Sequence, residues 1–137
     1  MVDGSSQAVA KVLVMDDDEM VRFVAGETLK RYGFEVEFAN DGAQAVELYR
    51  EHRQAGEPFA AVILDLNIPG GMGGEEAMKR LLEIDPDAKG YVSSGRTDDP
   101  VMMNYRSFGF SGTIEKPYFY LNKESMEDFS KILHGTR

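Results

Sequence analysis

Short apolar runs alternate with longer amphipathic stretches along the whole chain. This alternation is typical of parallel strands joined by helical crossovers, because a buried strand is apolar on both faces and a crossover helix on one. The apolar runs predict five strands, at residues 12–15, 35–39, 60–64, 90–93 and 113–114. The sequence therefore predicts an α/β fold built around a parallel sheet.

Helical spacing predicts a helix after each of the first two strands. The first helix has one apolar face, which consists of Val21, Val24, Ala25, Thr28, Leu29 and Tyr32. Gly33 follows it as a C-terminal cap residue. Asp41 and Gln44 have the spacing of a capping box at the start of the second helix. Its inward positions are predicted to be Ala43, Val46 and Tyr49.

Three more helices are predicted in the second half of the chain. One spans residues 75–84, and the last spans 121–133. Between them a fourth helix has Asp99 as its cap, Pro100 at its first position and Gly109 at its end. Its inward side chains are predicted to be Val101, Tyr105 and Phe108. Five strand and helix pairs account for the chain after its first ten residues.

Composition limits the class of protein. The chain has 137 residues, 42% hydrophobic and 28% charged, which is typical of one globular domain. No apolar run approaches the roughly 20 residues that cross a bilayer, so we expect no membrane contact by this domain. The formal net charge of -9 repels phosphate backbones and argues against nucleic-acid binding.

The chain has no cysteine, which excludes disulfides, zinc thiolates and cysteine nucleophiles. Residues 1–10 have neither the basic start nor the apolar core of a signal peptide. Both observations fit a cytoplasmic location. We expect residues 1–10 to be a flexible segment, residues 11–134 to form the domain and residues 135–137 to be a tail.

Polar residues follow the predicted strands. Asp16 and Asp17 come after the first strand, Asp65 after the third, Ser94 after the fourth and Lys116 after the fifth. Ligands bind at this carboxyl edge of an open parallel sheet. Converging carboxylates repel one another unless a cation lies among them, and an all-oxygen set of this kind suits Mg²⁺. A lysine and a hydroxyl would then bind phosphoryl oxygens, so the pattern predicts phosphoryl transfer to a carboxylate.

Four segments in this order resemble the receiver domain of response regulators: VLVMDDDEMVR, VILDLNIPGGMGG, VSSGR and GTIEKPY. The resemblance implies a flavodoxin-like doubly wound sheet of strand order 2-1-3-4-5 with five helices. It also implies that Asp65 is the phosphoacceptor. Asp17 and Asp65 would ligate Mg²⁺ with the backbone carbonyl of Asn67, and Asp16 would act through water.

The same resemblance implies that Lys116 contacts the phosphate and that Ser94 is the switch hydroxyl. The implied phosphoryl donor is a histidine kinase or a histidine phosphotransfer domain. The sequence leaves the output open between a homodimer and relay to another histidine. The segments IPGGMGG, SSGR and YRSFGFSGTIEKPY look most like receivers attached to hybrid sensor histidine kinases. The family often has an aromatic residue at the position of Thr113, so an aromatic-coupled switch is not expected here.

Two other functions fit parts of the sequence. Asp16 and Asp18 after a strand resemble the paired aspartates of haloacid-dehalogenase phosphatases, although the chain is short for that fold and Met20 departs from its motif. In that function Asp16, not Asp65, would carry the covalent phosphate. A receiver domain that is never phosphorylated and acts only as a docking module would have no covalent aspartate.

Overall fold

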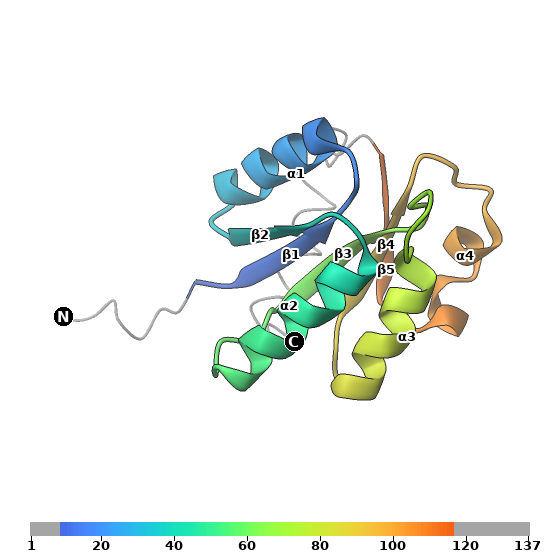
Figure 1. Ribbon diagram of the computed structural model, residues 1–137. Coiled ribbons are helices and arrows are strands. Elements are labelled where there is room, and N and C mark those ends of the chain that lie inside the picture. The colour runs from blue at the N-terminus through green and yellow to red at the C-terminus, as the bar shows by residue number, and fades with distance from the viewer. Residues whose placement is uncertain (1–8, 117–137) are drawn as a thin grey trace.

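The computed structural model describes residues 9–116 and contains a five-stranded parallel sheet of order β2-β1-β3-β4-β5 (Figure 1). The strands are β1 Lys11–Met15, β2 Glu35–Ala39, β3 Ala61–Asp65, β4 Gly90–Ser94 and β5 Gly112–Glu115. Each strand pairs in parallel with its neighbours in the sheet. The predicted doubly wound, flavodoxin-like architecture is confirmed. Each strand begins and ends within two residues of the predicted positions.

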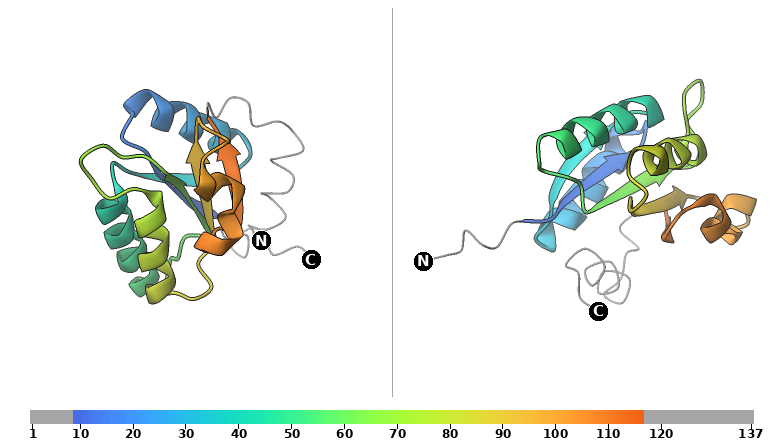
Figure 2. Two further views of the ribbon diagram at one scale, coloured as in Figure 1. Left: turned by 90° about the vertical axis from the view of Figure 1, so that its right-hand side faces the viewer. Right: turned by 90° about the horizontal axis from the view of Figure 1, so that it is seen from below.

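The helices lie on both faces of the sheet. They are α1 Glu19–Arg31, α2 Gly42–Gln54, α3 Gly74–Ile84, the short α4 Pro100–Met103 and a 3-10 turn, η2, over Tyr105–Phe108. Figures 1 and 2 show α1 on one face and α2 beside α3 on the other. None of the helices in the described part is long and apolar enough to cross a membrane. The expected helix over 121–133 and most of the expected terminal segments lie outside the described residues.

The core has two halves, one on each face of the sheet. Alternate residues of a strand point to opposite faces. Leu13 and Leu64 pack in the half beneath α2 and α3, whereas Val14 and Ile63 pack in the half beneath α1. Strands β1 and β3 are buried along nearly their whole length. Coverage of both faces explains why their sequences are uninterrupted apolar runs.

Side-chain caps set the starts of α1 and α2. Asp18 caps α1 by accepting hydrogen bonds from the N–H groups of Met20 at 2.9 Å and Val21 at 3.3 Å. At α2, Asp41 accepts from the Gln44 N–H at 2.9 Å. Gln44 reaches back and accepts from the residue before the cap at 2.6 Å. These bonds satisfy N–H groups that have no partner within the helix, and they confirm the predicted start of α2.

Two helix faces differ from the prediction. Tyr32 is the C-cap residue of α1, not part of its buried face, and is 47% exposed because the helix has ended at Arg31. In α2 the buried positions are Gly42, Ala45, Val46 and Tyr49. Ala43 is exposed, since the buried face starts one residue earlier, where Gly42 contacts the loop that precedes α3.

The fourth helix is shorter than predicted. It ends at Met103, and Asn104 adopts φ −123° and ψ 40°, which is not helical. The Asn104 side-chain amide donates to the carbonyl of Pro100 at 3.0 Å, and such side-chain bonds compete with the regular helix. Tyr105 and Phe108 therefore lie in a 3-10 turn and are only half-buried. Gly109 closes this segment at φ +90°, a conformation that favours glycine.

Candidate functional site

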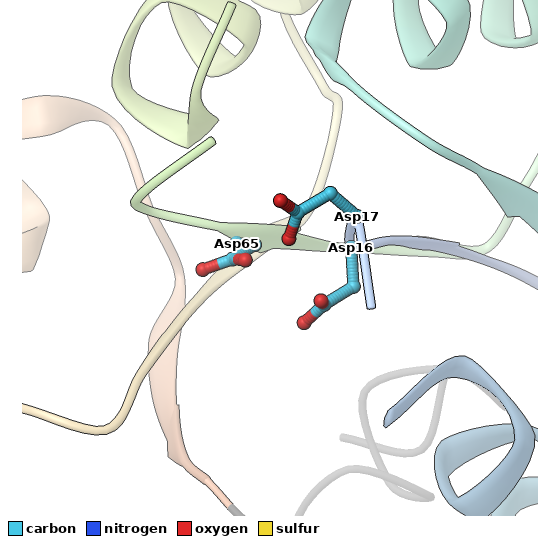
Figure 3. Close-up of side chains that lie close together, drawn as sticks. All are labelled: Asp16, Asp17 and Asp65. Atoms are coloured by element: carbon cyan, nitrogen blue, oxygen red, sulfur yellow. The ribbon is translucent and has the colours of Figure 1, made fainter. Parts of the chain in front are cut away.

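Three carboxylates meet at the carboxyl edge of the sheet. Asp16 and Asp17 follow β1, and Asp65 ends the adjacent strand β3. One carboxylate oxygen from each lies within 4.8 Å of the others (Figure 3). Asp16 is fully buried and Asp65 is 2% exposed, whereas Asp17 faces solvent. The fold thus brings together the three aspartates that the sequence predicts at this edge.

Lys116 reaches the two buried carboxylates from the edge strand β5. It follows β5, and its Nζ lies 2.8 Å from Asp16 Oδ2 and 3.0 Å from Asp65 Oδ2. Burial lowers the pKa of Lys116, but its bonds with Asp16 and Asp65 raise it more, so the net shift is upward. The ammonium therefore stays charged at neutral pH and balances part of the negative charge.

The surroundings of the Asp65 carboxyl disfavour its charged form. Burial raises its pKa above the ordinary value, and the negative charge of Asp16 raises that pKa further. The Lys116 ammonium and the N–H of Asn67, which donates to Asp65 Oδ1 at 3.2 Å, oppose the shift without cancelling it. Added positive charge at this position would relieve the repulsion between Asp16 and Asp65.

The chain around Asp16 is held by two further hydrogen bonds. Asp16 Oδ1 accepts from the N–H of Asp18 at 2.9 Å, and its carbonyl oxygen accepts from Arg22 Nη1 at 2.7 Å. No role for Arg22 is predicted from the sequence. The available signal was its place in the segment VLVMDDDEMVR, in the first turn of a helix that begins beside the acidic edge.

Ser94 and Asn67 also lie at this edge, but neither side chain is bonded to the acidic cluster in the described part. Ser94 ends β4 and is 2% exposed, and its Oγ accepts a hydrogen bond from the Arg96 N–H at 3.0 Å. Asn67 is exposed and approaches Asp65 through its backbone N–H. Among residues 9–116 the Asp65 carboxylate is thus paired with the side chain of Lys116 and not with that of Ser94.

Glycines seat the start of α3 against the end of β3. A Cβ at Gly73 would lie 2.5 Å from the carbonyl oxygen of Leu66, and one at Gly74 would lie 2.8 Å from that of Asp65. Any other residue would push these backbone segments apart. The loop is also tied to α2, because the N–H of Gly42 donates to the carbonyl of Met72 at 2.8 Å. The backbone behind Asp65 is thus fixed on two sides.

The donor set suits a hard divalent cation. All three side chains offer carboxylate oxygens, and the exposed Asp17 leaves one side of the cluster open to water. Mg²⁺ binds through one or two carboxylates and keeps several waters, whereas sites for softer metals contain histidine or cysteine. The residues present therefore fit Mg²⁺, which would also offset the repulsion between Asp16 and Asp65.

The geometry disfavours the phosphatase alternative. In that function Asp18 would face the reacting group together with Asp16. Instead, the Asp18 carboxylate caps α1, and its Oδ1 accepts from two N–H groups of the first turn. Its contribution to the site is its backbone N–H, which donates to Asp16.

Comparisons with known proteins agree with this geometry. The sequence model of the response regulator receiver domain matches residues 12–125. The chemotaxis protein CheY of Bacillus subtilis is 31% identical over 109 residues, which are 79% of this chain and 86% of that protein. The hybrid signal transduction histidine kinase I of Dictyostelium discoideum is 29% identical over 91 residues, 66% of this chain but 5% of that protein.

The fold also matches solved structures. A chain of the CheX-CheY-BeF3-Mg²⁺ complex from Borrelia burgdorferi superposes with a TM-score of 0.79 and 21% identity. The match covers 97% of this chain and 95% of that one. At this identity the likeness concerns the fold, and it extends over nearly the whole of both chains.

Proposed function

The chain belongs to the response regulator receiver domain family, whose members are phosphoacceptors in two-component signalling, and on that premise we propose that Asp65 is the phosphorylated residue. The observation that carries the proposal is the position of the Asp65 carboxylate. It is buried between Asp16 and Lys116, with the Lys116 Nζ 3.0 Å away. A nucleophilic carboxylate and a fixed positive charge thus lie side by side at the open edge of the sheet.

The proposed reaction is an in-line displacement at phosphorus. An oxygen of the Asp65 carboxylate attacks the phosphoryl group of a phosphohistidine. The new O–P bond forms as the P–N bond breaks, and the electron pair returns to the imidazole nitrogen of the donor. Lys116 balances negative charge on the phosphoryl oxygens, and the Asn67 N–H orients the carboxylate. The product is an acyl phosphate on Asp65.

We assign the cation of this reaction as Mg²⁺. Asp17, Asp65 and the backbone carbonyl of Asn67 are the proposed ligands, and Asp16 would act through water. When bound, Mg²⁺ supplies positive charge to the phosphoryl oxygens. The role of the chain is to keep the ligand residues in place. For Asp16, the hydrogen bonds from the Asp18 N–H and from Arg22 do this.

Ser94 is the proposed switch. Its hydroxyl would donate to a phosphoryl oxygen on Asp65 and leave its present bond with the Arg96 N–H, which is 3.0 Å long. The loop between Ser94 and α4 would then shift its conformational equilibrium. Thr113 is exposed on the neighbouring strand and pairs with Val92, so the response does not depend on an aromatic side chain at that position.

The proposed setting is a phosphorelay in the cytoplasm. The donor is a histidine kinase or a histidine phosphotransfer domain, and the domain spans residues 11–134. The segment that resembles a hybrid histidine kinase supports a receiver attached to, or derived from, such a kinase.

Intact-mass analysis tests the proposal. The wild-type chain, Asp65→Asn and Asp16→Asn are incubated with Mg²⁺ and a small acyl-phosphate donor. We expect one phosphoryl adduct on the wild type, none without Mg²⁺ and none on Asp65→Asn. Adduct on Asp65→Asn together with none on Asp16→Asn would support the phosphatase instead. A folded wild-type chain that binds Mg²⁺ and takes no adduct would support a docking module.

A further inference from the structure

Ser93, the residue before the proposed switch serine, has a buried hydroxyl that the proposed mechanism leaves unused. Its side chain is fully buried in β4, and its Oγ has no hydrogen-bond partner among the described residues. A hydroxyl in this state has lost water without gaining a replacement, and most buried polar side chains are bonded. We therefore expect the Ser93 hydroxyl to have a hydrogen-bond partner in another state of the site.

The sheet register places Ser93 beside the reacting groups. Ser93 pairs with Asp65 on one side and with Ile114 on the other. Tyr91 and Ile114 belong to the core half beneath α1. Because alternate residues share a face, Ser93 points to the same face as Tyr91, and Lys116 follows Ile114 on that face. Ser94 points to the opposite face, so the two serines cannot have the same role.

Lys116 must cross β4 to reach its partners. It follows β5, whereas Asp16 and Asp65 lie on β1 and β3, and β4 stands between them. Its stem therefore passes over β4 on the face that carries Ser93. An ammonium has three N–H donors, and the ion pairs with Asp16 at 2.8 Å and Asp65 at 3.0 Å engage at most two of them.

Both present partners of Lys116 belong to the acidic cluster. A cation bound by the cluster draws on oxygens of the same carboxylates and leaves the lysine with fewer acceptors. We propose that Ser93 is a positioning residue whose hydroxyl then accepts a hydrogen bond from Lys116 Nζ and keeps the ammonium beside Asp65. This inference rests on the proposed function, in which Asp65 is the phosphoacceptor.

The test compares Ser93→Ala with Ser93→Thr, which keeps the hydroxyl, and follows phosphorylation by a small acyl-phosphate donor with Mg²⁺ present. We expect Ser93→Ala to slow phosphorylation about tenfold and Ser93→Thr to stay within about threefold of the wild type. Without Mg²⁺ the thermal midpoint of Ser93→Ala should equal or exceed that of the wild type, because an unpaired buried hydroxyl has been removed. Slower phosphorylation without loss of stability is not expected of a purely structural residue.

A second readout follows Lys116 itself. In ¹⁵N-lysine-labelled protein with Mg²⁺ and beryllofluoride, the Lys116 ammonium is the signal missing from Lys116→Arg. Its proton exchange with water should be at least about threefold faster in Ser93→Ala than in the wild type.

The inference is overturned if Ser93→Ala phosphorylates at the wild-type rate, if Ser93→Thr is as slow as Ser93→Ala, or if exchange at Lys116 is unchanged. A wild-type chain that takes no phosphoryl group, or an Asp65→Asn chain that still takes one, overturns the proposed function and this inference together. Normal modification of the wild type at Asp65, with Ser93→Ala modified at the same rate, overturns this inference alone.

Discussion

At the carboxyl edge of the sheet, two carboxylates of like charge lie close together and are buried, where water cannot screen their repulsion. Asp16 and Asp65 are both buried, and among residues 9–116 one ammonium, that of Lys116, lies between them. The raised pKa of Asp65, caused by burial and then by Asp16, shows that the metal-free site disfavours its own charged form. Such a site lowers the stability of the fold in exchange for cation binding and nucleophilic reactivity.

Removal of the Asp65 charge should therefore stabilise the metal-free chain. At pH 7.5 with chelator, Asp65→Asn should raise the free energy of unfolding by about 1 kcal/mol. Because the folded-state pKa of Asp65 is raised, the stability penalty of its ionisation is full above that pKa and disappears as the pH falls from it toward the ordinary value of the unfolded chain. The advantage of Asp65→Asn should therefore shrink on acidification.

Urea unfolding at pH 7.5 and at pH 4.5 measures both effects. Asp98→Asn is the matched control, since Asp98 is exposed and its neighbour Arg96 lies 3.6 Å away at the surface. An Asp65→Asn chain that is less stable than the wild type at pH 7.5 without metal would contradict the electrostatic account.

The sequence predicted the residue types of the site better than their contacts. Asp16, Asp17, Asp65 and Lys116 each follow or end a strand, so their meeting at one edge follows from the parallel topology. The unpaired state of Ser93 could not be predicted in the same way. Adjacent serines look alike in a sequence, and only the register with β3 and β5 shows which face each one occupies.

At the level of elements, variants at the start of α1 distinguish a residue that stabilises the fold from one that takes part in the reaction. Asp18 caps the helix through its side chain. Asp18→Ala should lower the free energy of unfolding by about 1 kcal/mol, whereas Asp18→Asn, which keeps a capping oxygen, should change it little. Both variants should still accept a phosphoryl group.

Denaturant unfolding and intact mass of the same two variants check these expectations. Loss of phosphorylation in Asp18→Asn, with the fold intact, would mean that Asp18 takes part in the reaction and would support the phosphatase alternative.

The loop between β3 and α3 should tolerate no side chain at Gly73, where it meets the backbone just after Asp65. A Cβ at Gly73 would lie 2.5 Å from the carbonyl oxygen of Leu66, which is backbone and cannot turn aside. Gly73→Ala should therefore destabilise the fold by about 2 kcal/mol. Gly95→Ala is the control, because nothing lies within 4 Å of a Cβ there. Equal thermal midpoints for the two variants would contradict the close approach.

The helices show where sequence patterns are insufficient. Strands β1 and β3 were predicted within two residues because burial on both faces leaves an apolar run. The fourth helix was predicted too long, since a residue that bonds to its own backbone, here Asn104, interrupts a helix without disturbing the apolar spacing. Tyr32 and Ala43 were wrongly placed because the ends of a buried face depend on contacts from other segments.

For the whole molecule, charge and topology act together. The chain carries 24 acidic and 15 basic side chains, and three of the carboxylates gather at one edge of the sheet. A net negative field attracts divalent cations and basic partner surfaces, and it repels nucleic acids. The parallel sheet orders the strand ends so that this charge lies beside a nucleophile, which makes the edge suited to phosphoryl transfer.

The most direct measurement is the position of the covalent phosphate. The wild-type chain is phosphorylated by a small acyl-phosphate donor with Mg²⁺ and then treated with borohydride, which reduces an aspartyl phosphate to homoserine. Peptide sequencing by mass spectrometry locates the change. The account predicts homoserine at position 65 alone, dependent on Mg²⁺ during phosphorylation. Homoserine at position 16, or phosphate on any other side chain, would contradict it.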